Sequence, residues 1–438
     1  MEMHYFILAM RRIRNDWWIS ALTILALAVG VSATMTSQLV IRMLDADPLP
    51  GRSQSLFYVR ADPQPASEDE KPLPDMLDYR TATDLWSLRG QDRGALVADG
   101  SMSLQDERGK ALIDATFLAT TSDFFTLFRT RFRFGSAWSS ADEQRLVPSV
   151  VISDRLNEVL FHGGNSVGRM LRVDGRSLQV VGVLAPWRPS PRFYLMAGGH
   201  DGGANASDVF GPAHDLYIPM PLAKEIALPH MSWFTCWGQL RSPSQLATAP
   251  CLWVGLWVQA STDADRRAYS ERVSAYVKSQ LASGRFTRGT RPELIGLTDW
   301  IAYNNVIPRD VRLQSWLSYG LFIVCLINIG GLLFVRFSGR RSEIALRRAL
   351  GATQASIAWQ CTAESLVVGL IGAALGMLLT TGATSYVRSL PTAYANLIHL
   401  GAVALAVTVA VALVAALIAS IIPTVLVARQ APGQFLKE

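Results

Sequence analysis

The chain has 438 residues, of which 50% are hydrophobic and only 17% are charged. This balance excludes a disordered chain, and it is unusual for a soluble enzyme, in which about a quarter of the residues are charged. The net charge of +6 arises from 41 basic and 35 acidic residues, and long apolar runs separate the basic clusters. That placement indicates a membrane partner rather than nucleic acid. Four cysteines are too few for a disulfide-dense scaffold.

The N-terminal region combines a basic segment, residues 1–17, with a charge-free apolar run over residues 18–41. A helix needs about 20 apolar residues to cross the ~30 Å hydrocarbon core of a bilayer. Arginines before an apolar run are also typical of a cleaved signal peptide, but this run exceeds the roughly 7–15 apolar residues of such a peptide. A buried core helix fits neither the length nor the arginine and tryptophan flanks. We therefore predict a first membrane span after an amphipathic N-terminal segment.

Three further apolar runs lie near the C-terminus, over residues 316–335, 357–386 and 397–427. The last run is longer than a straight span requires, so we expect it to tilt. Basic residues gather before the first span, between the second and third spans (residues 336–356), and after the fourth span (residues 428–438). Cytoplasmic loops carry the excess of Lys and Arg. We therefore predict four transmembrane helices in the cell's inner membrane, with both termini in the cytoplasm.

The segment between the first two spans, residues 45–312, is expected outside the cytoplasm. Its short strand-like and helix-like patterns alternate, which predicts a large extracytoplasmic α+β domain. Residues 171–183 alternate apolar and polar side chains around Asp174-Gly175, which predicts a β-hairpin. Further strands are predicted over residues 147–151 and 252–258, and helices over residues 122–128, 154–161 and 265–281.

Cys236 and Cys251 lie 15 residues apart in this outside segment. Because the outside of the membrane is oxidising, we predict a disulfide between them. Closing a loop of this size contributes roughly 3 kcal/mol in the chain-entropy model. The alternative is that both residues are small buried hydrophobic side chains.

The sequence contains none of the common catalytic or nucleotide-binding motifs. It has no P-loop, no His-Glu-x-x-His, no Cys-x-x-Cys and no Gly-x-Ser-x-Gly. His200 and His214, each followed by an aspartate, flank a Gly-rich stretch and could bind a metal, but a surface loop explains them better. We therefore expect no catalytic residues, no ATP-binding site, no metal and no cofactor in this chain.

The loop between the second and third spans contains the most informative motif. Ile344, Leu346 and Leu350 predict an amphipathic helix, and Gly351 fits its C-terminal stop. A basic helix that lies on anionic lipid headgroups would by itself explain the arginines of this loop.

The same loop resembles the signature R-R-x-E-I-G-L-R-R-A-L-G-A of the MacB/FtsX-type ABC permeases. The similarity extends over most of the chain in the family's order, through residues 9–14, 22–31, 115–142, 150–184, 215–220 and 360–366. At the C-terminus the chain keeps Pro423 and Pro432 of the family's pattern, but Thr424 replaces its first alanine. The sequence lacks the fused ATPase domain of the macrolide exporter.

This resemblance implies a dimer of four-span permeases, formed with a second copy or a sister permease. Each permease would be docked on a separate ABC ATPase subunit that binds ATP and magnesium. Residues 340–350 would form the coupling helix on that ATPase, and its expected contacts are Arg340, Arg341, Glu343, Arg347 and Arg348. The resemblance also implies a porter-like part, residues 45–140 and 230–312, and an inserted part, residues 141–229.

Two features of the third span allow more than one interpretation. Gly372 and Gly376 form a Gly-x-x-x-Gly motif that predicts close helix packing, and such motifs also mediate dimerisation. Glu364 could be functional as an intramembrane acid. Its place near a helix N-terminus also favours a structural charge, which would be paired with Arg347 or Arg348.

Three functions are open at this stage. The first is a transporter subunit that exports or releases a peptide, a lipid-linked molecule or a drug-like molecule, together with a periplasmic adaptor and an outer-membrane channel in some branches. The second is a non-transporting mechanotransducer that controls a cell-wall hydrolase or a sensor kinase. The third, a membrane-anchored enzyme, is disfavoured because the catalytic motifs are missing.

Overall fold

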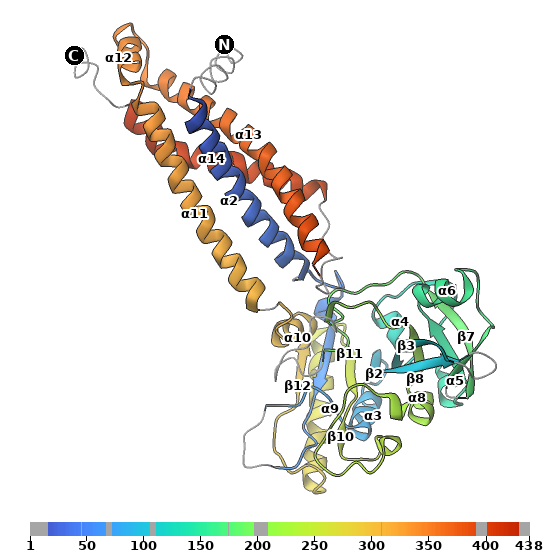
Figure 1. Ribbon diagram of the computed structural model, residues 1–438. Coiled ribbons are helices and arrows are strands. Elements are labelled where there is room, and N and C mark those ends of the chain that lie inside the picture. The colour runs from blue at the N-terminus through green and yellow to red at the C-terminus, as the bar shows by residue number, and fades with distance from the viewer. Residues whose placement is uncertain are drawn as a thin grey trace. The chain divides into compact units, whose positions relative to one another are not determined.

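The computed structural model describes residues 16–44, 46–66, 72–105, 111–173, 175–196, 209–307, 309–390 and 401–428. The chain divides into two compact units (Figure 1). The helical unit comprises Met1–Asp45 and Ile307–Glu438, and the α+β unit comprises Ala46–Val306. The predictions for the N-terminal segment, for His200, for the start of the fourth run and for the C-terminal tail lie outside the described residues.

Four long helices build the helical unit. They are α2 (Trp17–Leu44), α11 (Arg309–Ser338), α13 (Gln354–Ser389) and α14 (Ala402–Ala428). Each is long and apolar enough to cross a membrane. The prediction of four spans is confirmed, and α2, α11 and α13 extend past both ends of their apolar runs because polar turns continue them. The chain is a multi-pass membrane protein.

Small residues allow these helices to pack closely. A Cβ atom on Gly372 would lie 2.6 Å from Cδ2 of Leu27 in α2, and one on Gly376 would lie 3.6 Å from Ala28. Leu27 and Ala28 are almost completely buried. The Gly-x-x-x-Gly motif of α13 therefore packs against α2 of the same chain. This is the close helix packing that the motif predicts.

One mixed ten-stranded sheet forms the α+β unit, in the order β12-β1-β11-β2-β3-β8-β5-β7-β4, with β6 paired to β2 and β7. The strands are β1 (Leu56–Arg60), β2 (Gly94–Gln105), β3 (Ala111–Thr120), β4 (Phe132–Gly135), β5 (Ser149–Ile152), β6 (Met170–Val173), β7 (Arg176–Leu184), β8 (Leu216–Pro219), β11 (Gly255–Gln259) and β12 (Glu293–Gly296). The predicted hairpin is β6–β7, in which Leu171 lies opposite Leu178.

Short helices connect and cover these strands. They are α3 (Tyr79–Ser87), α4 (Asp123–Leu127), α5 (Ser140–Gln144), α6 (Asp154–Phe161), α8 (Met220–Ile226), α9 (Asp263–Ala282) and α10 (Leu297–Tyr303), with single turns η1 (Ser53–Ser55), η2 (Leu228–His230) and η3 (Pro243–Gln245). The longest, α9, begins with a capping box formed by Thr262 and Asp265. It buries Tyr269, Val273 and Val277, which lie one turn apart on the same face of the helix.

The predicted porter-like and inserted parts share this sheet. Strands β3 and β8, one from each part, pair in parallel. Strand β4 lies within residues 45–140 but pairs with β7 of the inserted part. The predicted border at residue 140 therefore does not coincide with a boundary in strand pairing.

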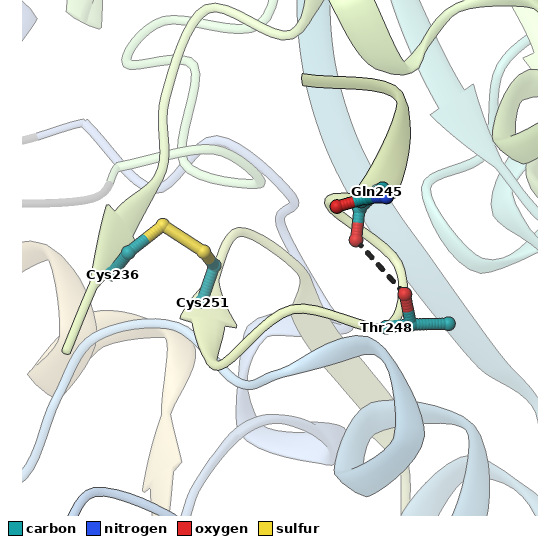
Figure 2. Close-up of a disulfide and its surroundings, with 4 residues drawn as sticks. All are labelled: Cys236, Gln245, Thr248 and Cys251. Atoms are coloured by element: carbon teal, nitrogen blue, oxygen red, sulfur yellow. Dashed lines mark hydrogen bonds between the residues drawn. A yellow bond between two sulfur atoms is a disulfide. The ribbon is translucent and has the colours of Figure 1, made fainter. Parts of the chain in front are cut away.

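A disulfide joins Cys236 and Cys251, the pair that the sequence analysis selects (Figure 2). The two residues lie opposite each other in the small antiparallel ladder of β9 (Thr235–Cys236) and β10 (Cys251–Leu252). Within the loop that it closes, the Thr248 hydroxyl donates a hydrogen bond to the Gln245 carbonyl oxygen at 3.1 Å. Cys251 is completely buried, so the disulfide ties this loop to the core.

Candidate coupling site

A short amphipathic helix, α12 (Arg341–Ala349), lies between the second and third long helices, as predicted. Figure 1 shows it at the end of the helical unit where α11 ends and α13 begins. The acidic Glu343 lies in its first turn and Arg347 and Arg348 lie in its last turn, which complements the helix dipole. Gly351 follows its end with φ of +96°, a conformation that side chains with a Cβ rarely adopt.

The two faces of α12 differ. Ala345 is buried, and Ile344 packs against the core of the helical unit. On the other face, Leu346 is 54% exposed and Leu350 is 80% exposed. These leucines are one turn apart and adjacent to half-buried arginines. The helix therefore presents an exposed apolar ridge with basic neighbours.

An ion cluster fixes the start of α12. Arg340 Nη1 donates to both carboxylate oxygens of Glu364, at 3.3 and 3.0 Å. Its Nη2 donates to Asp16 Oδ2 at 2.8 Å. The exposed fractions of the three side chains are 15% for Arg340, 3% for Glu364 and 31% for Asp16. One guanidinium thus connects the residue before α2, the N-cap of α12 and the third turn of α13.

Arg347 extends this cluster from the last turn of α12. Its Nη2 lies 2.7 Å from Glu343 Oε1, and its Nη1 donates to Gln360 Oε1 at 2.8 Å. Gln360 in turn donates to Glu364 at 3.3 Å. The sequence analysis expects Arg347 or Arg348 beside Glu364; in the structure Arg347 is linked to Glu364 through Gln360, and Arg340 donates to Glu364 directly. The link from α12 to α13 is short, so the last turn of α12 lies beside Gln360, and Arg340 reaches the next turn.

The charge of Arg340 is secured by its partners. Burial alone would lower its pKa, but the carboxylates of Glu364 and Asp16 outweigh burial, so the pKa of Arg340 is raised. Arg336, at the end of α11, is also buried, and its Nε lies 4.0 Å from Asp16 Oδ2. The cluster therefore combines cationic and anionic side chains from α11, α12, α13 and the residue before α2.

The structure brings together four of the predicted coupling and membrane residues: Arg340, Glu343, Arg347 and Glu364. The side chain of Arg341 lies outside the described residues. Sequence reasoning missed Asp16, Gln360 and Arg336. A count of basic residues locates the cytoplasmic side but ignores acids, so it gives no signal for Asp16.

The second predicted candidate, the histidines of the α+β unit, is structural where it is described. Nδ1 of the buried His214 lies 3.1 Å from the Tyr194 hydroxyl, and its Nε2 lies 3.8 Å from Asp99. Burial lowers the pKa of His214 although Asp99 opposes it. The adjacent Asp215 accepts hydrogen bonds from Arg155. Among the described residues, no group of three or more His, Cys, Asp or Glu side chains could hold a metal ion.

Comparison with known proteins gives the family. Residues 20–276, more than half of the chain, match the MacB-like periplasmic core domain family, and residues 316–432 match the FtsX-like permease C-terminal family. The macrolide export ATP-binding/permease protein MacB of Syntrophobacter fumaroxidans is 22% identical, over 68% of this chain and 44% of its own length. The chain therefore spans less than half of that relative.

A relative of more similar length is the ABC transporter permease YknZ of Bacillus subtilis, 20% identical over 85% of this chain and 83% of its own length. Among solved structures, the extracellular domain of YknZ from Gram-positive bacteria aligns with 55% of this chain and 99% of its own, at 12% identity and a TM-score of 0.35. Since the first family covers more than half of the sequence and the second covers three of the four long helices, the chain belongs to the MacB/FtsX-type ABC transporter permeases.

Proposed function

We propose that this chain couples ATP hydrolysis by a separate ATPase subunit to motion of its α+β unit. The observation that carries the proposal is α12, whose exposed ridge of Leu346 and Leu350 has no partner among the described residues. An exposed apolar patch beside basic side chains is typical of a protein interface. Docking of α12 into a groove on an ATPase would bury both leucines and engage Glu343, Arg347 and Arg348.

The chain offers two continuous paths from this end to the α+β unit. α2 ends at Leu44, and the α+β unit begins at Ala46; the unit ends at Val306, and α11 begins at Arg309. The Thr34 hydroxyl donates to the Ser318 carbonyl oxygen at 3.3 Å, and Gln38 donates to Ser315 at 3.1 Å, which links the far halves of α2 and α11. A displacement of the two helices would therefore be delivered to the α+β unit.

The disulfide supports an extracytoplasmic location for the α+β unit, because structural disulfides persist in oxidising compartments. With α12 on the opposite, cytoplasmic side, the chain would lie in the inner membrane with both termini inside. We propose that the cycle exports or releases a peptide, lipid-linked or drug-like molecule already outside the inner membrane. A second permease, and in some assemblies an adaptor and an outer-membrane channel, would complete the machine.

The test is a pulldown of the tagged full-length chain from its own membranes in mild detergent, with mass spectrometry and an ATPase assay. We expect an ABC ATPase to co-purify with the wild type and to be lost with Leu346→Glu/Leu350→Glu. The matched control is Val159→Glu on α6, a side chain that is 51% exposed in the α+β unit. Equal ATPase recovery with both variants, or a wild type that purifies without any ATPase, would refute the proposal.

The other proteins in the same pulldown separate the two modes of action. An adaptor or an outer-membrane channel supports export. A cell-wall hydrolase or a sensor kinase in their place would replace export by regulation of that partner and would leave the coupling role intact.

A further inference from the structure

We propose that Asp16, Arg340 and Glu364 form a joint that makes α12 move as one piece with α2 and α13. This inference rests on the proposed coupling role of α12 and names the residues that would deliver its motion. Asp16 and Arg340 would act as positioning residues, because they contact neither nucleotide nor substrate.

The backbone gives α12 freedom that the joint removes. α11 ends at Ser338 and α12 begins at Arg341, so Gly339 and Arg340 interrupt the helix between them. Arg340 has φ of −115° and ψ of 19°, outside helical geometry. Without side-chain contacts, such an interruption lets α12 swing relative to α11. In that case a displacement of α12 would bend the backbone at the interruption and would not move α2 and α13.

Two contacts of the Arg340 side chain restrain the chain at this interruption. Its contacts with Glu364 at 3.0 and 3.3 Å hold it to α13, and its contact with Asp16 at 2.8 Å holds it to the start of α2. A guanidinium offers its donors in a rigid plane, so contacts on two sides also fix its orientation. The N-cap residue of the coupling helix is therefore bound to two spans that lie far from it in sequence.

Burial distinguishes the Arg340–Glu364 contact of this joint from the neighbouring surface pair, whereas Asp16 is 31% exposed. Glu364 is 3% exposed and Arg340 is 15% exposed, whereas Glu343 and Arg347 are 42% and 39% exposed. Separating a buried pair leaves an uncompensated charge and is strongly disfavoured, but exposed pairs exchange partners at little cost. The Glu343–Arg347 pair can thus rearrange against an ATPase while the joint stays closed.

α2 is the helix that connects the joint to the α+β unit. Asp16 directly precedes this helix, which runs for 28 residues to Leu44 without a break. At 1.5 Å per residue its length is about 42 Å, enough to cross the membrane. Its close contact with Gly372 and Gly376 of α13 holds the two helices together along the way. Motion taken up at Asp16 therefore arrives at Ala46, the first residue of the α+β unit.

The experiment uses the complex of the full-length chain with the ATPase that co-purifies with it. Hydrogen exchange is compared between the nucleotide-free complex and the complex trapped with ATP and vanadate. The change in hydrogen exchange of peptides from α12 reports contact with the ATPase, and the change in peptides from residues 46–60 reports whether the motion reaches the α+β unit. The variants are Asp16→Asn, Asp16→Glu and Glu364→Gln, with Glu271→Gln on an exposed position of α9 as the matched control.

In the wild type, in Asp16→Glu and in Glu271→Gln we expect both regions to respond to ATP. In Asp16→Asn and Glu364→Gln we expect the α12 response to persist and the response of residues 46–60 to be lost. A purely structural role would not separate the two responses or be rescued by Asp16→Glu. If Glu364→Gln does not fold, the partly exposed Asp16 carries the test by itself.

The joint would be refuted if Asp16→Asn responded like the wild type in both regions, or if Asp16→Glu behaved like Asp16→Asn. It would also be refuted if Asp16→Asn lost both responses, because the cluster would then be part of the surface that binds the ATPase. A wild-type chain that brings down no ATPase refutes the proposed function instead, and that result is distinguishable from all three.

Discussion

Replacing Cys236 and Cys251 by alanine should measurably destabilise the α+β unit. The two residues are 15 positions apart and face each other across β9 and β10. Closing a loop of this size stabilises a fold by about 3 kcal/mol, because the unfolded chain loses conformational freedom. In a domain of roughly 150–250 residues, each kcal/mol shifts Tm by about 2–4 °C. We therefore expect a drop of ~6–12 °C.

The measurement is thermal unfolding of the full-length chain in detergent without reductant, followed by tryptophan fluorescence. Trp253 and Trp257 are buried in the α+β unit close to the disulfide in sequence, so they report its unfolding. The matched control is Cys325→Ala/Cys361→Ala, which removes the same number of thiols from the helical unit and should leave this transition in place.

A shift below about 2 °C would refute the entropic argument. It would mean that the loop is already restrained by its own contacts, such as the buried Leu246 and the hydrogen bond from Thr248 to Gln245. A separate result would bear on location: non-reducing mass mapping that finds both thiols free in the chain purified from cells would contradict an oxidising environment for the α+β unit.

Two further predictions concern packing and pH. Gly372→Leu places its Cβ 2.6 Å from Leu27 Cδ2, so we expect the chain to lose about 1–3 kcal/mol of stability, measured by unfolding of the purified chain in detergent. Leu27→Ala should restore part of this loss. A variant as stable as the wild type would show that the two helices are not closely packed at this position. Burial lowers the pKa of His214, so the folded chain keeps it neutral while the unfolded chain protonates it near the usual pKa of about 6.5. Stability should therefore fall as the pH drops below about 6.5, by at most about 1.4 kcal/mol per pH unit for this proton. His214→Gln should flatten the slope of Tm against pH, and an unchanged slope would contradict the assignment.

Features determined by local pattern could be predicted from the sequence. The four spans follow from long apolar runs, α6 from its helical spacing, and the β6–β7 hairpin from alternation around Gly175. The α12 helix follows from its amphipathic spacing and from Gly351. In each case the residues that determine the element lie within it or within a few positions of its end.

Features that join distant segments could not be predicted in the same way. Nothing local marks the pairing of Phe117 in β3 with Leu216 in β8, because both strands are buried and any strand edge would accept them. The contact of Arg340 with Glu364 joins residues 24 positions apart on either side of α12, and no local pattern marks it. The role of Asp16 depends on a contact across 324 positions of sequence.

The parallel pairing of β3 and β8 places the end of one strand beside the end of the other, with Thr120 opposite Pro219. The chain thus leaves the first half of the sheet and resumes its course at neighbouring positions, with the two strands only about 4.8 Å apart. The segment between these residues, which contains β4 to β8, thus begins and ends at neighbouring positions of the sheet. The length and sequence of this segment can therefore change without altering the path of the strands and helices that connect to the membrane spans.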